Sequence, residues 1–171
     1  MTIDQVTADL RRSLGLGDDF PRGDGALALV HSLSPTCRVR EVRGLPHAFL
    51  CRLPRGAVIC SPPGDWRGQL HEAFHVLGDV GLAAMLGRYG TVTAALCRLK
   101  EEAAVHRAVR AFLMPRPLCI GLEAWELAEA AEVPVEMARA RLSEVTREFP
   151  LEDDDEEEAA VRRWLTDGAA G

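Results

Sequence analysis

The sequence is poor in aromatic residues, paired cysteines and long apolar runs. Aromatic residues make up only 5% of it, so smaller apolar side chains must supply most of the core. Its five cysteines form no Cys-x-x-Cys pair, which argues against a cysteine-based zinc site and favours reduced thiols. No apolar run approaches the roughly 18 residues of a membrane span, and no apolar leader opens the chain. We therefore expect a soluble, cytoplasmic protein without membrane association.

Positive charge is also in short supply. Acidic residues number 26 against 20 basic ones, which gives a net charge of −6. This balance does not favour binding driven by phosphate neutralisation, so direct nucleic-acid binding is not expected. With 171 residues, 47% of them hydrophobic, the chain can bury one good core.

The pattern His-Glu-x-x-His stands at His71-Glu72-Ala73-Phe74-His75, inside a proline-free window with apolar residues at helical spacing. On a helix, His71 and His75 lie on one face and can direct their imidazoles to one point. Two imidazoles and a third protein ligand suit Zn²⁺ with an open position for water, and Glu72 beside them suits a general base. The competing interpretation is a helix that carries two ordinary histidines.

The rest of the chain predicts an α+β fold that is mostly helical. Three short β-rich segments, punctuated by Gly and Pro, predict an antiparallel meander before the motif helix. His47 is expected to be a surface histidine at the start of the second strand. The expected elements are helices at 2–14 and 26–33, strands at 37–43, 47–53 and 56–60, a motif helix from 66 to about 86 capped by Asp65, and a long helix at 92–113 capped by Thr91.

Two short helices, 123–133 and 134–149, follow and form a helix-turn-helix-like pair, with Pro134 at the first position of the second helix. Their basic residues (Arg139, Arg141 and Arg147) are matched by glutamates, which favours packing over DNA reading. An acidic run at 152–158 is typical of a solvated linker or a helix start. We expect a zincin-like unit at 1–120, the helix pair at 121–150 and an acidic tail at 151–171.

The third metal ligand is predicted to be Glu102 rather than Glu101. On a continuous helix the face of Glu102 includes Leu99, His106 and Val109, so its carboxylate would be buried and would need a partner such as zinc. Glu101 would instead form a surface ion pair with Arg98. Asp79 and His106 are the competing donors, although Asp79 would have to reach the metal from the helix that already supplies two ligands.

The window from Glu101 to Pro115 resembles the signature that follows His-Glu-x-x-His in the ImmA/IrrE family of metallopeptidases. In that family a glutamate is followed by Ala-Asn, Phe-Ala and a Leu-Leu-Met-Pro ending. Counting back from Met114-Pro115 places the family's glutamate ligand on Glu102. A zincin-like fold is implied, and the resemblance covers about residues 1–148.

The resemblance implies a bacterial zinc endopeptidase that cleaves or inactivates a small helix-turn-helix repressor, in stress response or mobile-element control. His71, His75 and Glu102 would bind zinc, and Glu72 would act as general base. His106, one turn beyond Glu102 on the same helix face, is a candidate either to stabilise an oxyanion or to orient a ligand.

Several positions differ from the family pattern. The chain has Phe74 for a glycine, His106 for an asparagine, Ala108 for a phenylalanine and Asp79 for a further histidine. We hypothesise that Phe74 fills the volume that Ala108 leaves. The alternative function, favoured by Phe74 and Asp79, is a regulatory binding protein that retains zinc with little or no turnover.

Overall fold

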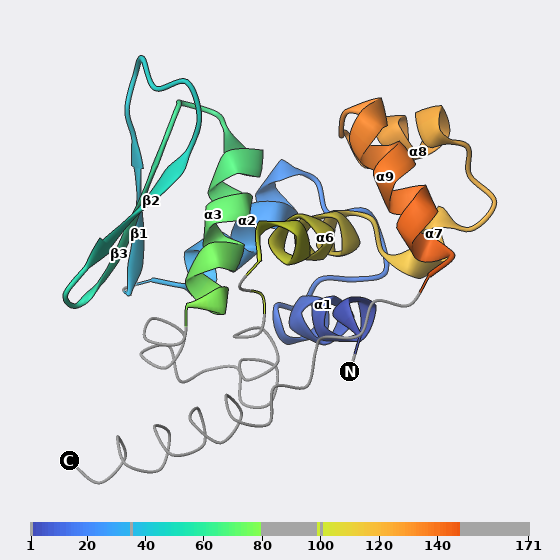
Figure 1. Cartoon of the computed structure of the whole chain (residues 1–171), viewed down its shortest axis with the longest axis horizontal. Coiled ribbons are helices and arrows are strands. Elements are labelled where there is room, and N and C mark those ends of the chain that lie inside the picture. Colours follow the sequence, from blue (N-terminus) through green and yellow to red (C-terminus); the bar gives the residue numbers. More distant parts are fainter. Residues whose placement is uncertain (1, 35, 80–98, 100, 148–171) are drawn as a thin grey trace, which may run out of the picture.

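The computed structural model describes residues 2–34, 36–79, 99 and 101–147 (Figure 1). Within these residues the fold is α+β and mostly helical, as the sequence predicts, and none of the helices is long and apolar enough to cross a membrane. The elements, in chain order, are α1 (Ile3–Ser13), α2 (Gly23–Ser32), β1 (Cys37–Glu41), β2 (Phe49–Leu53), β3 (Gly56–Ser61), α3 (Trp66–Gly78), α6 (Glu102–Leu113), α7 (Arg116–Cys119), α8 (Ala124–Ala130) and α9 (Val135–Val145).

The three strands form a mixed sheet in the order β1-β3-β2, so the predicted antiparallel meander is wrong. β1 pairs with β3 in parallel, and only the β2–β3 hairpin is antiparallel. β3 has no charged residue, and its inward-facing Ala57 and Ile59 are buried, whereas β1 and β2 carry arginines. The apolar strand therefore takes the centre and the charged strands take the edges, where solvent reaches them. The connection through residues 42–48 carries the chain from one edge to the other.

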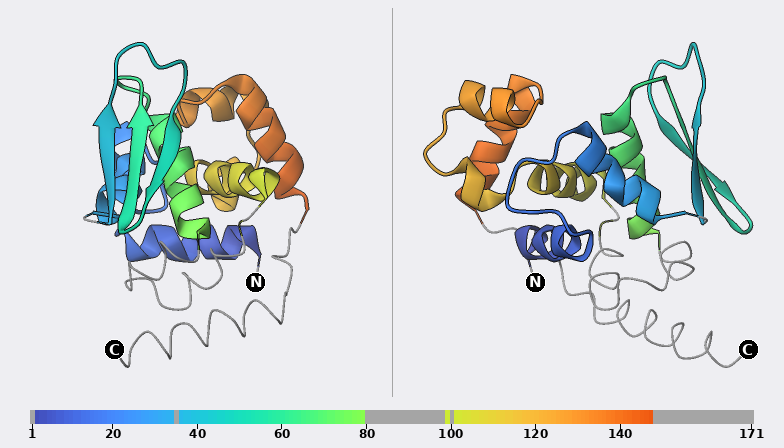
Figure 2. Two further views of the ribbon diagram at one scale, coloured as in Figure 1. Left: turned by 60° about the vertical axis from the view of Figure 1, so that its left-hand side comes forward. Right: turned by 180° about the vertical axis from the view of Figure 1, so that it is seen from behind.

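Helix α3 lies between the sheet and α6 in all three ribbon views (Figures 1 and 2). It also packs against α2, so its surroundings bury Leu70, Phe74 and Leu77 completely. The rings of Phe74 and Phe112 meet edge to face, with centroids 5.6 Å apart, and join α3 to α6. Ala108 is also fully buried. The core thus fixes α3 and α6 relative to each other, although the hypothesis that Phe74 fills space left at Ala108 remains untested.

The helix boundaries agree with the sequence in part. The predicted helix at 2–14 is confirmed by α1, and Asp65 caps α3 as expected, accepting a hydrogen bond from the backbone N–H of Gly68. α2 begins at Gly23, three residues before the predicted start. Asp79 is the C-terminal cap of α3, and residues 80–86, which the sequence assigned to the same helix, lie outside the described residues.

The predicted continuous helix at 92–113 is wrong around residue 100. Leu99 and Glu101 are not helical, and α6 begins at Glu102 with Glu101 as an extended N-cap. A glutamate at the first helical position is favourable because its charge complements the helix dipole. The segment at 92–98, with its proposed cap Thr91, lies outside the described residues.

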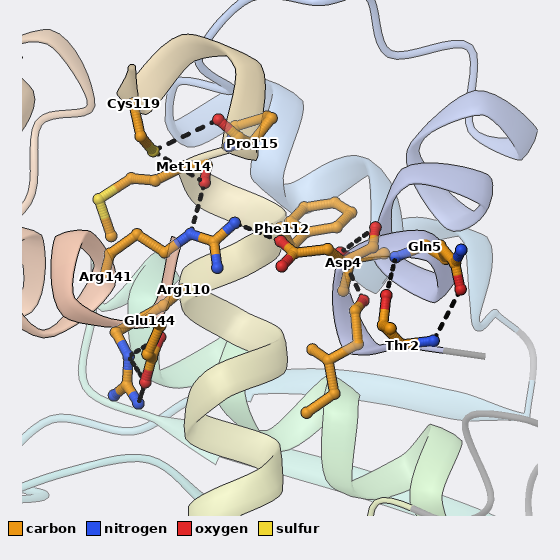
Figure 3. A network of polar contacts seen from close by, with 12 residues as sticks. Thr2, Asp4, Gln5, Arg110, Phe112, Met114, Pro115, Cys119, Arg141 and Glu144 are labelled. Carbon is orange, nitrogen blue, oxygen red and sulfur yellow. Dashed lines mark hydrogen bonds and ion pairs between the residues drawn. The ribbon is translucent and has the colours of Figure 1, made fainter. Parts of the chain in front are cut away.

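The C-terminal helices pack on the rest of the fold through buried arginine contacts (Figure 3). Arg141 of α9 donates from Nε to the Met114 carbonyl (2.8 Å) and forms an ion pair with Asp4 of α1. Glu144 of α9 accepts a two-pronged ion pair from Arg110 of α6. Arg141 is only 2% exposed and therefore has the packing role that the sequence predicts.

Two details of this region differ from the prediction, and a third segment lies outside the described residues. Pro134 is the N-cap of α9 rather than its first residue, because its extended backbone precedes the helix. The single-turn α7 was not predicted. The acidic run at 152–158 lies outside the described residues.

Candidate metal centre

His71 and His75 lie one turn apart on α3, with their side chains 21% and 22% exposed. Two local features set where this helix begins. The Asp65 side chain caps it, and Gly68 lets its first turn approach the residue that precedes β2, since a Cβ at Gly68 would lie 2.7 Å from the Ala48 Cβ. Both imidazoles, whose ring centroids are 4.8 Å apart, therefore face the start of α6.

Glu102 meets both imidazoles from the first position of α6. Its Oε1 lies 3.0 Å from His71 Nε2, and its Oε2 lies 3.1 Å from His75 Nε2. The structure thus brings together the two motif histidines and the glutamate that the sequence singled out. The carboxylate acts as a bridge between the two rings.

The expectation that Glu102 is buried is wrong, because its side chain is 59% exposed. The sequence argument placed Glu102 on a buried face. Helix α6 does bury Val109 and Leu113 on that face, as well as Val105, Ala108 and Phe112, but burial of the Glu102 face begins only about two turns beyond the glutamate. That argument assumed a helix running through Leu99 and Glu101, whereas α6 starts after them. Glu102 therefore sits at the rim of the α3–α6 contact, where solvent reaches it.

Glu101 and Asp79, the two carboxylates not chosen as the third metal ligand, lie outside the cluster. Glu101 is the exposed N-cap of α6 and is not part of the cluster. Asp79 forms an ion pair with Arg52 of β2, with an Nε–Oδ2 distance of 2.7 Å. His47 is exposed and precedes β2, as expected of a surface histidine.

His106 is brought closer to the centre than the sequence indicated. Its Nε2 lies 3.0 Å from Glu102 Oε1, the same oxygen that His71 contacts. One donor atom from each of His71, Glu102 and His106 can be chosen so that all three lie within 4.8 Å of one another. His75 does not belong to this group of three. The signal was present in the sequence, because Glu102 and His106 are four residues apart on one helix face.

Glu72 contacts the other nitrogen of His71, with 3.5 Å between its Oε1 and Nδ1. The hydrogen bond to Glu72 raises the pKa of His71, against the effect of burial. A carboxylate on Nδ1 fixes the tautomer in which Nε2 keeps a free lone pair. His71 Nε2 is buried and has no aligned hydrogen-bond partner, although Glu102 lies beside it. Either a proton on Nε2 or a cation bound between Nε2 and the Glu102 carboxylate would satisfy this pair of atoms.

The donor set of this cluster fits a divalent metal. His71, Glu102 and His106 could hold a metal ion, and His75 lies on the second oxygen of the same carboxylate. Burial, followed by the charge of His71, lowers the pKa of His106, which favours the neutral imidazole that a metal requires. Imidazole and carboxylate are ligands that suit zinc and its neighbours in the first transition series.

Comparisons with protein-family models, curated proteins and solved structures give no match for this chain.

Proposed function

We propose that the protein is a zinc-dependent endopeptidase of the ImmA/IrrE type that cleaves or inactivates a small helix-turn-helix repressor. The observation that carries this proposal is the meeting of His71 and His75, from α3, with the carboxylate of Glu102, from α6. These segments are about 30 residues apart in the chain, so their convergence is a property of the fold. His71 Nε2 is buried and lies 3.0 Å from Glu102 Oε1 without an aligned hydrogen bond, which supports a cation at this point.

Each residue of the cluster has a role in this proposal. His71, His75 and Glu102 would hold the ion, and Glu72 would keep His71 in the tautomer that offers Nε2. Bound zinc would supply a Lewis acid for the scissile carbonyl and acidify the attacking water. Glu72, whose side chain is 13% exposed, would accept the proton of that water and return it to the leaving amine.

Two features explain why the substrate would be a protein segment. The metal centre is open to solvent through Glu102 and His106, both of which are at least half exposed. It lies on the surface formed by α3 and α6, away from two cavities beside α1 whose linings share Arg11, Leu16 and Gly17. An accessible site of this kind admits an extended chain, and the family resemblance is the support for a repressor as that chain.

The second candidate function is a regulatory binding protein with a retained metal and little or no turnover. The contact of Glu72 with His71 favours it, because a carboxylate occupied with a ligand is less available as a base. The position of His106 against Glu102 favours it too, since a further donor competes with water.

Glu72→Gln separates the two functions. This variant should keep its metal, because Glu72 is not a predicted ligand and the amide oxygen of glutamine can still accept a hydrogen bond from His71 Nδ1. It should lose cleavage by roughly 10²- to 10⁴-fold, as expected for loss of a general base. The assay mixes zinc-loaded protein with any small helix-turn-helix repressor found to be encoded beside its gene and follows fragments by mass spectrometry.

The matched control is Glu101→Gln, which removes an exposed carboxylate from the neighbouring helix cap. It should cleave at the wild-type rate. Wild-type turnover by Glu72→Gln would refute the peptidase. Specific binding of the repressor without cleavage by any variant would establish the binding protein instead.

A further inference from the structure

His106 shares one oxygen atom with a predicted metal ligand. Its Nε2 and the Nε2 of His71 each lie 3.0 Å from Glu102 Oε1. The His71 and His106 rings are 4.7 Å apart between centroids and tilted by 42°, so they stand beside each other without stacking flat. Among the described residues, the His106 ring lies against Glu102 and His71. The ring therefore faces the position at which a metal would be bound.

The backbone of His106 is fixed by the packing of α6, whereas its imidazole ring can rotate. Glu102 and His106 are one turn apart on α6, and the fully buried Val105, Ala108 and Phe112 on an adjacent face anchor the helix in the core. The His106 side chain itself is 51% exposed. It can leave the cluster by rotating about its own side-chain bonds, without disturbing the core.

We propose that His106 is a further protein ligand of the metal and closes the site in the resting protein. With His71, His75 and Glu102 it completes a four-ligand set, which is typical of closed tetrahedral zinc sites that leave no position for water. A peptide substrate would then have to displace His106 to open the site. This inference rests on the proposed metal centre. It gives the additional histidine a role that is compatible with the three ligands of a peptidase.

The neighbourhood of His106 suits such a displaceable ligand. Arg110, one turn further along α6, is held by Glu144 of α9 and does not compete for the Glu102 carboxylate. The exchange of one exposed ligand against substrate needs only local rotation.

The test counts imidazole ligands directly. Zinc-loaded full-length protein is studied by X-ray absorption at the zinc edge, where each bound imidazole adds a characteristic scattering contribution, and the cobalt-substituted protein gives the coordination number from its visible spectrum. We expect three imidazoles and no solvent ligand in the wild type. His106→Asn should show two imidazoles and one solvent oxygen, and its affinity for zinc should fall about 10-fold or more.

The matched control is His47→Asn, which removes an exposed histidine that precedes β2. It should keep three imidazoles and the wild-type affinity. Two imidazoles in the wild type would overturn the inference even if His106→Asn fails to fold. An activity arm adds a second criterion, because opening the site should make His106→Asn cleave the repressor faster than the wild type, and slower cleavage by a metal-loaded variant would refute the displacement.

The outcomes distinguish this inference from the proposed function. A protein that binds no zinc refutes both. Three imidazoles together with no cleavage by any variant refutes the peptidase but retains His106 as a ligand. Two imidazoles together with normal cleavage refutes His106 as a ligand but retains the peptidase.

Discussion

Glu102 is the single residue on which the candidate metal centre most depends. Three imidazoles approach its carboxylate, two at one oxygen and one at the other. An exposed carboxylate ordinarily contributes little to an ion pair because solvent screens it. The Glu102 carboxylate matters here because it contacts both His71 and His75 and so connects the first turn of α6 to two successive turns of α3.

We predict that Glu102→Ala releases the metal, because it removes one ligand and the bridge between the others. Glu101→Ala should retain the metal, since Glu101 is an exposed helix cap outside the cluster. The measurement is elemental analysis of both variants after dialysis against a weak chelator. Equal metal content in the two proteins would rule out Glu102 as a ligand.

At the scale of single residues, the sequence predicted which side chains meet but not how much of each is exposed to solvent. His71 and His75 follow from the motif, and Glu102 follows from the family count, so the three were found correctly as neighbours. The burial argument for Glu102 was wrong because it depended on where α6 begins. The close approach of His106 was underestimated for a related reason. Helical spacing gives a shared face, but only the packing of α6 on α3 decides how near that face lies to His71.

At the scale of elements, the first turn of α3 positions the candidate metal centre. Asp65 accepts the hydrogen bond from Gly68 N–H, and Gly68 lies against Ala48 just before β2. His71 follows within one turn, so a shift of this turn would move its ring relative to α6. The glycine is needed for the close approach rather than for an unusual backbone conformation, since Gly68 is helical.

Gly68→Ala should therefore destabilise the fold. An added Cβ would lie 2.3 Å from Asp65 Oδ2 and 2.7 Å from the Ala48 Cβ, so the cap or the helix must shift, at a cost of about 1–3 kcal/mol. The matched control is Gly25→Ala in α2, where the nearest atoms are at 3.6 Å and 3.7 Å. There the higher helix propensity of alanine should be neutral or stabilise by up to about 1 kcal/mol.

Urea unfolding of the two variants measures this difference. A gain of stability at both positions would contradict the close approach of α3 to the residue before β2. The metal content of Gly68→Ala gives a second readout, because a displaced first turn should also weaken binding at His71.

The elements themselves were predictable where local signals set them, and the sheet order was not. The helical spacing of Ile3, Val6 and Leu10 and the cap at Asp65 are local signals, so α1 and the start of α3 were found correctly. The strand segments were also located, but neighbouring strands in sequence were assumed to pair. The absence of charge in β3, against the arginines of β1 and β2, is the signal that would have placed β3 at the centre.

At the scale of the whole molecule, the two ends of the described chain are joined. Arg141 of α9 and Asp4 of α1 are 137 residues apart in sequence and form an ion pair (Figure 3). Arg11 of α1, which is also buried, donates to the Phe112 carbonyl at the end of α6 over 2.8 Å. The N-terminal helix thus holds both the helix that carries Glu102 and the helix pair that follows it.

This connection explains why the helix-turn-helix-like pair belongs to the packing of the described fold. A free DNA-reading unit would present its arginines to solvent, yet Arg141 is committed to Met114 and Asp4 and is 2% exposed. Arg139 and Arg147 of the same region are exposed. The sequence could match these arginines to glutamates by count, but it could not say which of them turns inward, because that depends on contacts with α1 and α6.

We predict that Arg141→Met costs roughly 3 kcal/mol of unfolding free energy, because it leaves the Asp4 carboxylate without its partner in a partly buried place. The matched control is Arg12→Met, which breaks the exposed pair with Asp9 and should cost less than about 1 kcal/mol. Urea unfolding followed by circular dichroism gives both values. If α8 and α9 were an independent unit, Arg141→Met would lower a separate early transition and leave the main one at the wild-type midpoint. Because Arg141 joins α9 to α1, we expect instead one cooperative transition that moves as a whole to lower urea concentration.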